Sequence, residues 1–154
     1  MASLSVIQSS LADYFRIRVG ERVHELVKPL SSEQLWLRPF PYGNSIGNLI
    51  LHLTGNLNYY IGAQIAGTGY KRHRDLEFSA SGRPKDELLK DFDDAIQITV
   101  ATIENQSDQD WSVPYHAERA DGSTRFAQVL ACTGHAYHHI GQIIYLQREV
   151  LRER

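Results

Sequence analysis

The chain has 154 residues, of which 42% are hydrophobic and 22% charged, and its formal net charge is −2. This length fits one domain with one core, spanning residues 1–154. The charge gives no reason to expect nucleic acid as a partner, because nucleic-acid binders carry a basic face. The single cysteine, Cys132, excludes an intrachain disulfide and indicates a reducing compartment. The first residues lack a signal-peptide pattern, and no run reaches the roughly 18 apolar residues of a membrane span, so we expect a cytoplasmic protein.

Apolar residues at three- and four-residue steps predict two helices in the first half of the chain. The first spans about residues 4–27 and ends before Pro29, because the residue before a proline is pushed out of the helical region. The second spans about residues 46–66, with Asn44 or Ser45 as its N-cap.

The same spacing predicts two further helices, at about residues 85–105 and from the cap at Ser123 or Thr124 to about residue 152. Residues 68–83 and 106–122 are polar and are expected to form long loops. Strand-like alternation of apolar and polar residues is nearly absent. The sequence therefore predicts an all-α protein, a four-helix bundle.

Histidines in the segment GHAYHHIGQ, residues 134–142, indicate metal chemistry. His135 and His139 are four residues apart, which places both rings on one helix face within reach of a shared ion. His138 lies about 100° round the helix from His139 and could pair with His135 instead. The spacing alone is weak evidence, because surface histidines and hydrogen-bonded core histidines share it.

His52 is the candidate third ligand, because it lies in the most apolar part of the second helix, LILHL. A single histidine in such a place is more often a hydrogen-bonded core residue. Together with His135 and His139, however, it completes a set of three imidazoles. Three protein ligands leave a coordination position open for water or substrate, as in catalytic metal sites.

Three segments carry a family resemblance: NSIGNLILHLTGN at 44–56, RDLEF at 74–78 and HAYHHIGQI at 135–143. Residues 36–148 resemble the DinB/YfiT-like metalloprotein family, and within it the DUF1572-type subgroup. The resemblance implies a four-helix bundle with up-down-down-up topology. It also implies a metal ion, zinc or nickel, held by His52, His135 and His139. His138 stands where the family often has a tyrosine, which leaves the choice between His138 and His139 slightly open.

Residues near the three histidines have two interpretations each. Asn56 and Gln142 could orient an imidazole or could serve helix packing. Cys132 could join the metal as a thiolate, although a small buried apolar residue is the simpler interpretation. Gly141 is expected to permit close approach of a neighbouring helix.

The two predicted loops also carry candidate groups. His116 could act as a proton carrier if its loop covers the metal, or could be an ordinary loop residue. The basic segment 71–74 could attract an anionic substrate. Ion pairing of this segment with Asp75 and Glu77, or plain solvation, is the more economical account.

These observations lead to two hypotheses about function and to one in which no metal binds. The first is a metal-dependent enzyme, a hydrolase or a thiol-dependent transferase acting on a small molecule, including a low-molecular-weight thiol. No general base stands out, so the catalytic residues stay unknown. The second is a non-catalytic metal or small-ligand binding protein, for example a stress-related one, and in the third the histidines are simply packed. The family resemblance and apolar residues left over at Tyr14, Tyr145 and Leu151 suggest a homodimer.

Overall fold

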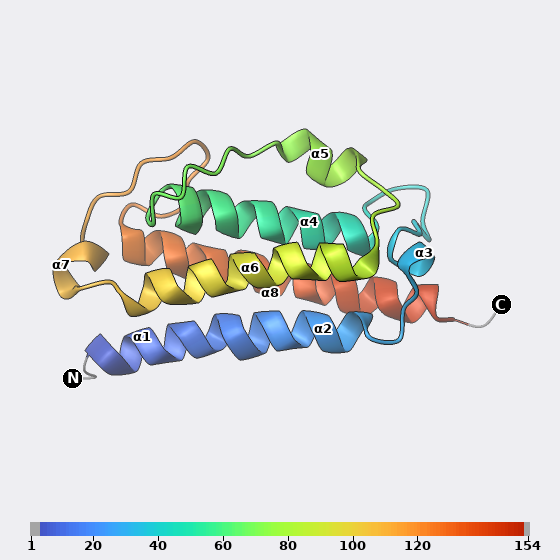
Figure 1. The fold of residues 1–154 in the computed structure, drawn as a ribbon, viewed down its shortest axis with the longest axis horizontal. Helices are drawn as coiled ribbons and strands as arrows, with labels where there is room; N and C mark the ends of the chain where they lie inside the picture. The colour runs from blue at the N-terminus through green and yellow to red at the C-terminus, as the bar shows by residue number, and fades with distance from the viewer. Residues whose placement is uncertain (1–3, 153–154) are drawn as a thin grey trace.

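The computed structural model describes residues 4–152, and its regular structure is helical (Figure 1). Helix α1 (Leu4–Asp13), the π-helical segment η1 (Tyr14–Glu21) and α2 (Arg22–Val27) form one continuous helix, because the residues at their junctions keep helical φ and ψ. A single turn, α3 (Ser32–Leu35), follows. Helix α4 (Ile46–Leu57) continues into the π-helical segment η2 (Asn58–Ala63).

The second half contains α5 (Arg74–Ser79), α6 (Lys85–Glu104), α7 (Asp108–Trp111) and α8 (Arg125–Val150). The all-helical prediction is confirmed: within residues 4–152 the only extended pairing is an isolated bridge between Pro114 and Thr124. The long helices begin and end within three residues of the predicted positions. The predicted loops were wrong in part, because α5 lies in the first of them and α7 in the second.

The directions of the long helices determine the path of the linker that carries α5. In Figure 1, α4 and α6 run the same way, opposite to α1–α2 and α8. The chain leaving η2 must therefore return along the whole of α4 before α6 can begin. This return path, residues 64–84, places α5 over the outer side of α4.

Hydrogen bonds tie α5 to the beginning of α4. The Ser45 hydroxyl caps α4 by accepting a hydrogen bond from the backbone N–H of Asn48. The Asn48 side-chain oxygen in turn accepts from the backbone N–H of Ser45, and the two bonds form a capping box. The Asn48 side-chain amide then donates to the backbone oxygens of Glu77 (3.1 Å) and Ala80 (2.9 Å). These hydrogen bonds fix the position of α5 relative to α4, the helix that carries His52.

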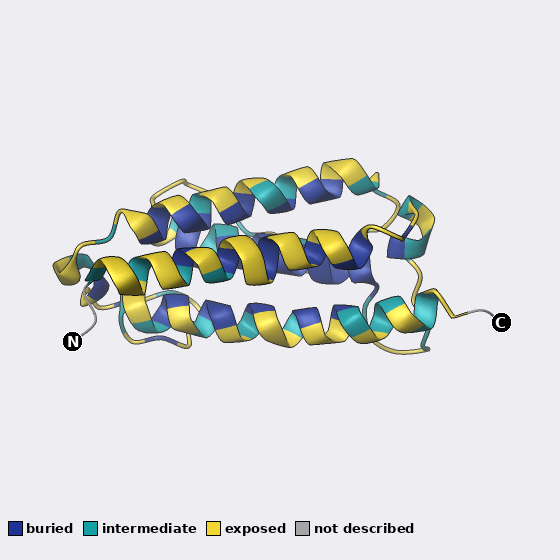
Figure 2. Ribbon diagram, turned by 90° about the horizontal axis from the view of Figure 1, so that it is seen from below, coloured by how far each residue is buried: buried dark blue, intermediate teal, exposed yellow. Residues whose placement is uncertain are grey.

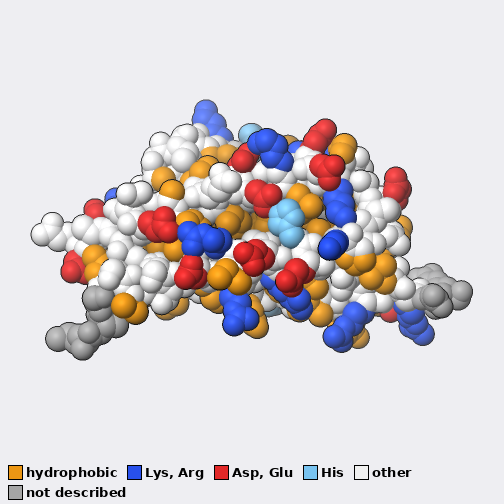
Figure 3. Space-filling model, turned by 60° about the horizontal axis from the view of Figure 1, so that its bottom comes forward, with side chains coloured by type: hydrophobic (Ala, Val, Ile, Leu, Met, Phe, Trp, Pro, Cys, Tyr) orange, Lys and Arg blue, Asp and Glu red, His pale blue; other side chains and the backbone are white. Residues whose placement is uncertain are grey.

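The helix α1–α2, α6 and α8 each bury one stripe of residues and leave the opposite face in water (Figure 2), whereas α4 is buried along almost its whole length. Phe15, Leu53, Phe92 and Ile143, one from each long helix, are fully buried in a common core. The outer face of α1–α2 and α6 carries interspersed acidic and basic side chains (Figure 3). In the described part of the chain, no helix is both long and apolar enough to cross a membrane.

Candidate metal centre

The three predicted histidines converge between α4 and α8. The Nε2 atoms of His52 and His139 each lie 3.1 Å from Nε2 of His135. One ring nitrogen from each of the three lies within 4.8 Å of the others, so the group could hold a metal ion. His138 is exposed and is not part of this group, although its ring packs against His139.

Glu77 on α5 holds the outer nitrogen of His52. The Nδ1 atom of His52 donates to Glu77 Oε2 at 2.7 Å. Glu77 is only 5% exposed and also accepts from Arg72, through Nε at 2.6 Å and Nη2 at 2.9 Å. Gly55 makes room for the carboxylate, because a Cβ there would collide with Glu77 Oε1.

This contact was missed by sequence reasoning. The alternative in which the basic segment pairs with nearby acids is confirmed for Arg72, but Glu77 itself was placed in a solvated loop. The only sequence signal was the acid within the RDLEF segment that carries part of the family resemblance.

The outer hydrogen bonds determine where the ring protons lie. A carboxylate only accepts, so His52 carries its proton on Nδ1 and presents a lone pair at Nε2. His139 Nδ1 lies 2.7 Å from Gln142 Oε1 and likewise donates outward. Both lone pairs face Nε2 of His135, which can donate one hydrogen at most. At least one lone-pair contact is therefore left, and a shared cation would relieve it.

The protonation states also suit metal ligands. Burial, reinforced by His139 and His52, lowers the pKa of His135 to about 3. Burial likewise lowers the pKa of His139 to about 4, although the hydrogen bond that His139 donates to Gln142 acts in the opposite direction. For Glu77, burial raises the pKa, but the hydrogen bonds of His52 and Arg72 outweigh it, so the pKa is lowered. Neutral imidazoles and an ionised outer carboxylate are the forms that metal binding requires.

The spacing of the nitrogens fits one ion. Zinc-bound imidazole nitrogens lie about 2.0–2.1 Å from the metal, so two of them are separated by little more than 3 Å. The two 3.1 Å separations are close to this value. In addition, no described residue hydrogen-bonds to the buried Nδ1 of His135, so no competing hydrogen bond holds that ring in another orientation.

The structure separates the interpretations of the neighbouring residues. Gln142 orients an imidazole, as one of its two alternatives predicted, whereas no hydrogen bond joins Asn56 to the three histidines within residues 4–152. Cys132 is buried outside the cluster, with its Sγ atom 3.6 Å from Gln128 Nε2, and burial raises its pKa to about 12. The thiol therefore behaves as a small buried apolar group.

Two further expectations have clear outcomes. His116 is exposed on its loop and, among the described residues, has no hydrogen bond or ring contact with the three histidines. The expectation for Gly141 was wrong: a Cβ at this position would meet nothing within 4 Å in the described chain.

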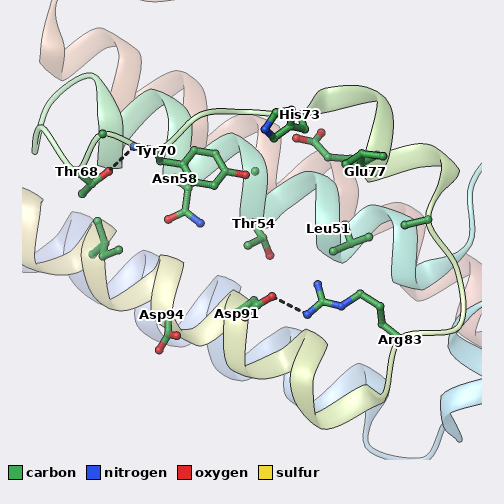
Figure 4. Close-up of a pocket in the computed structure, with 15 residues that line it drawn as sticks. Leu51, Thr54, Asn58, Thr68, Tyr70, His73, Glu77, Arg83, Asp91 and Asp94 are labelled. Atoms are coloured by element: carbon green, nitrogen blue, oxygen red, sulfur yellow. Dashed lines mark hydrogen bonds and ion pairs between the residues drawn. The ribbon is translucent and has the colours of Figure 1, made fainter.

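A groove of about 710 Å³ lies on the other side of Glu77, between α4, the linker and α6 (Figure 4). Charged side chains lie among its lining residues, and Arg83 pairs with Asp91 across 2.8 Å. Glu77 thus lies between this groove and His52.

Comparison with known proteins places this architecture in a family. The model of the family described as "Protein of unknown function (DUF1572)" matches residues 5–154. The chain belongs to the DUF1572 family. A crystal structure of a conserved protein from Enterococcus faecalis is similar to this DUF1572 chain, with a TM-score of 0.75 and 18% identity over 98% of this chain and 99% of that one. That likeness shows a shared helical fold, and no curated protein matches the sequence.

Proposed function

We propose that His52, His135 and His139 bind one divalent metal ion, zinc or nickel, and that this DUF1572 protein is a metal-dependent enzyme acting on a small molecule. The observation that carries the proposal is the convergence of three Nε2 atoms. The outer nitrogens of two of these rings, His52 and His139, are held by Glu77 and Gln142. Imidazole nitrogens suit both ions.

We also propose that the fold is the DinB-like four-helix bundle. Its support is the direction of the long helices, in which α4 and α6 run opposite to α1–α2 and α8 (Figure 1). The ligand distribution supports it as well, with one histidine on α4 and two on α8.

The chain's own residues hold the site in a defined geometry. Glu77 and Gln142 each accept a hydrogen bond from the outer N–H of an imidazole, and Arg72 holds the Glu77 carboxylate by two hydrogen bonds. The Phe78 ring packs on the His52 ring with centroids 4.9 Å apart, which limits rotation of that imidazole. When bound, a divalent ion supplies Lewis acidity, which polarises a substrate oxygen or lowers the pKa of a water or thiol.

Catalysis is favoured over simple metal storage by the number of ligands. Three converging side chains leave room for another ligand, whereas closed structural zinc sites use four. Both hydrolysis and thiol transfer use such an open position, so both reactions belong to the proposal. A non-catalytic metal or small-ligand binding protein is the alternative.

The first experiment measures metal in protein purified without a histidine tag. About one equivalent of zinc or nickel is expected in the wild type, and a large loss in His135→Ala. His138→Ala is the matched control, because this neighbouring histidine is exposed and outside the cluster. Less than about a tenth of an equivalent, with no thermal shift on adding either ion, would overturn the proposal.

The second experiment separates enzyme from binding protein. Metal-loaded protein is screened against ester, amide and thiol-conjugation substrates, with His135→Ala as the inactive reference. Turnover that depends on the metal supports the enzyme. If fully loaded protein turns over none of these substrates, the binding protein becomes the better conclusion.

We further propose a homodimer. Tyr145 is 69% and Leu151 41% exposed, which leaves apolar surface on α8 and at its end. Tyr14 contributes less, because its hydroxyl already donates to Thr133 O at 3.3 Å within the chain. Light scattering that finds a monomer alone would refute the dimer.

A further inference from the structure

A second cavity, of about 480 Å³, lies between α8 and the segment before α4. We call it the aromatic cavity. Its volume is within the range of sites that bind small molecules. The residues that matter for its chemistry are Phe40, Tyr42, Asn44, His138, Gln142 and Tyr145.

The aromatic cavity borders the candidate metal centre. Gln142 lines the cavity and accepts from Nδ1 of His139 at 2.7 Å. His138 also lines it, and its ring packs on the His139 ring with centroids 5.0 Å apart. A molecule in the cavity is therefore one side chain away from a proposed metal ligand.

The cavity is neutral. No lysine, arginine, aspartate or glutamate of the described chain lines it. The groove between α4 and α6 is different, since Arg83, Asp91 and Asp94 line it (Figure 4). A charged ligand would lose its hydration in the aromatic cavity without gaining a partner of opposite charge.

Aromatic rings provide the surface that such a ligand would contact. The rings of Phe40 and Tyr42 are stacked, with centroids 5.9 Å apart and planes at 15°. Tyr42 is 77% exposed. Large aromatic side chains held at the rim of a cavity offer flat surfaces for another ring.

Gln142 adds a directional group. Its Oε1 is engaged by His139, while its Nε2 donates to no described residue. The Nε2 amide group can therefore donate a hydrogen bond to a carbonyl oxygen of a ligand. A ligand with an aromatic ring and an uncharged carbonyl matches both the rings and this donor.

We propose that the aromatic cavity binds an uncharged aromatic amide or ester beside the metal centre. The inference deepens the proposed function and rests on it for any reaction, although binding in the cavity can be measured without metal.

Gly141 offers a way to fill the cavity. It lines the cavity from α8, and a Cβ there would meet nothing within 4 Å in the described chain, so a larger side chain can enter the space without straining the fold. Gly134 is the matched control. It lies two turns earlier on the same helix, is exposed, is equally free of neighbours within the described residues, and is not among the cavity's lining residues.

The test titrates metal-free protein with 2-naphthamide at pH 7 and follows the ligand by NMR. Gly141→Leu is expected to weaken binding by about tenfold or more, and Gly134→Leu to change it by less than about twofold. The probe 2-naphthoate, which has the same shape and a negative charge, is expected to bind about tenfold more weakly. Gln142→Ala is expected to weaken the binding of 2-naphthamide, because it removes the amide that donates to the ligand's carbonyl oxygen.

Three results would overturn the inference: no saturable binding of 2-naphthamide, equal affinity in the two leucine variants, or binding of 2-naphthoate as tight as that of the amide. Zinc stoichiometry is measured separately on the same samples. If one zinc binds and 2-naphthamide does not, the cavity assignment fails while the metal proposal stands. If 2-naphthamide binds as expected and no metal does, the cavity assignment stands and the proposed function fails.

Discussion

Gly55→Ala is a sharp test of how the site is built, because it adds one methyl group and removes no polar group. Gly55 is buried on α4, next to the carboxylate of Glu77. A Cβ there would collide with Glu77 Oε1. The other carboxylate oxygen of Glu77, Oε2, accepts a hydrogen bond from His52 Nδ1 at 2.7 Å, so a shift of the carboxylate also affects His52. The substitution therefore acts on the imidazole through Glu77.

The expected magnitude follows from two opposing effects. Alanine is about 1 kcal/mol better than glycine inside a helix. Against this, Glu77 accepts three hydrogen bonds, two from Arg72 and one from His52, and hydrogen bonds to charged groups contribute about 1.5–3 kcal/mol each. Loss of one of them outweighs the helical gain, so Gly55→Ala is expected to lower the free energy of unfolding by about 1 kcal/mol.

Urea unfolding of the metal-free protein measures this change, with Gly134→Ala as the control. At Gly134 the new methyl group meets nothing within 4 Å among the described residues, so only the helical gain of up to about 1 kcal/mol is expected. The two variants should therefore differ by about 2 kcal/mol with opposite signs. Zinc affinity, measured by competition with a chelator, should fall about tenfold in Gly55→Ala alone. Equal stabilisation of both variants would refute the role assigned to Glu77.

Three other predictions concern the site and the core. Gln142→Ala should weaken metal binding by about 10–100-fold, with little effect on urea unfolding because the side chain is exposed; unchanged affinity in a chelator competition would contradict the orienting role. The folded pKa values of His135 and His139, about 3 and about 4, lie below the ordinary value of 6.5, so the unfolded chain binds more protons in this window. The free energy of unfolding of metal-free protein should therefore fall as the pH drops from about 6.5 to about 4, and a flat profile in urea titrations would count against it. Burial raises the pKa of Cys132 to about 12, so at pH 8 a thiol reagent such as 5,5′-dithiobis(2-nitrobenzoate) should label native protein far more slowly than urea-unfolded protein; equally fast labelling would show that the thiol is accessible.

The sequence alone determined the long helices and the pairing of two histidines on one helix face. Helix hydrogen bonds and the three- and four-residue spacing of apolar side chains depend on near neighbours, so the long helices could be predicted to within a few residues. For the same reason, the shared face of His135 and His139 follows from their four-residue separation. Capping at Ser45 and Thr124 was equally local.

The tertiary structure decided what surrounds those rings. His52 is 83 residues away from His135 in the sequence, and only the packing of α4 against α8 brings their nitrogens to 3.1 Å. Glu77 lies in a polar stretch of the sequence, residues 68–83, which predicted a solvent-exposed loop. It is buried because α4 and α6 run in the same direction, which sends the linker back over α4 (Figure 1). Local spacing can place a ring on a helix face, but the partner of each ring nitrogen depends on which distant segment the chain's path brings beside it.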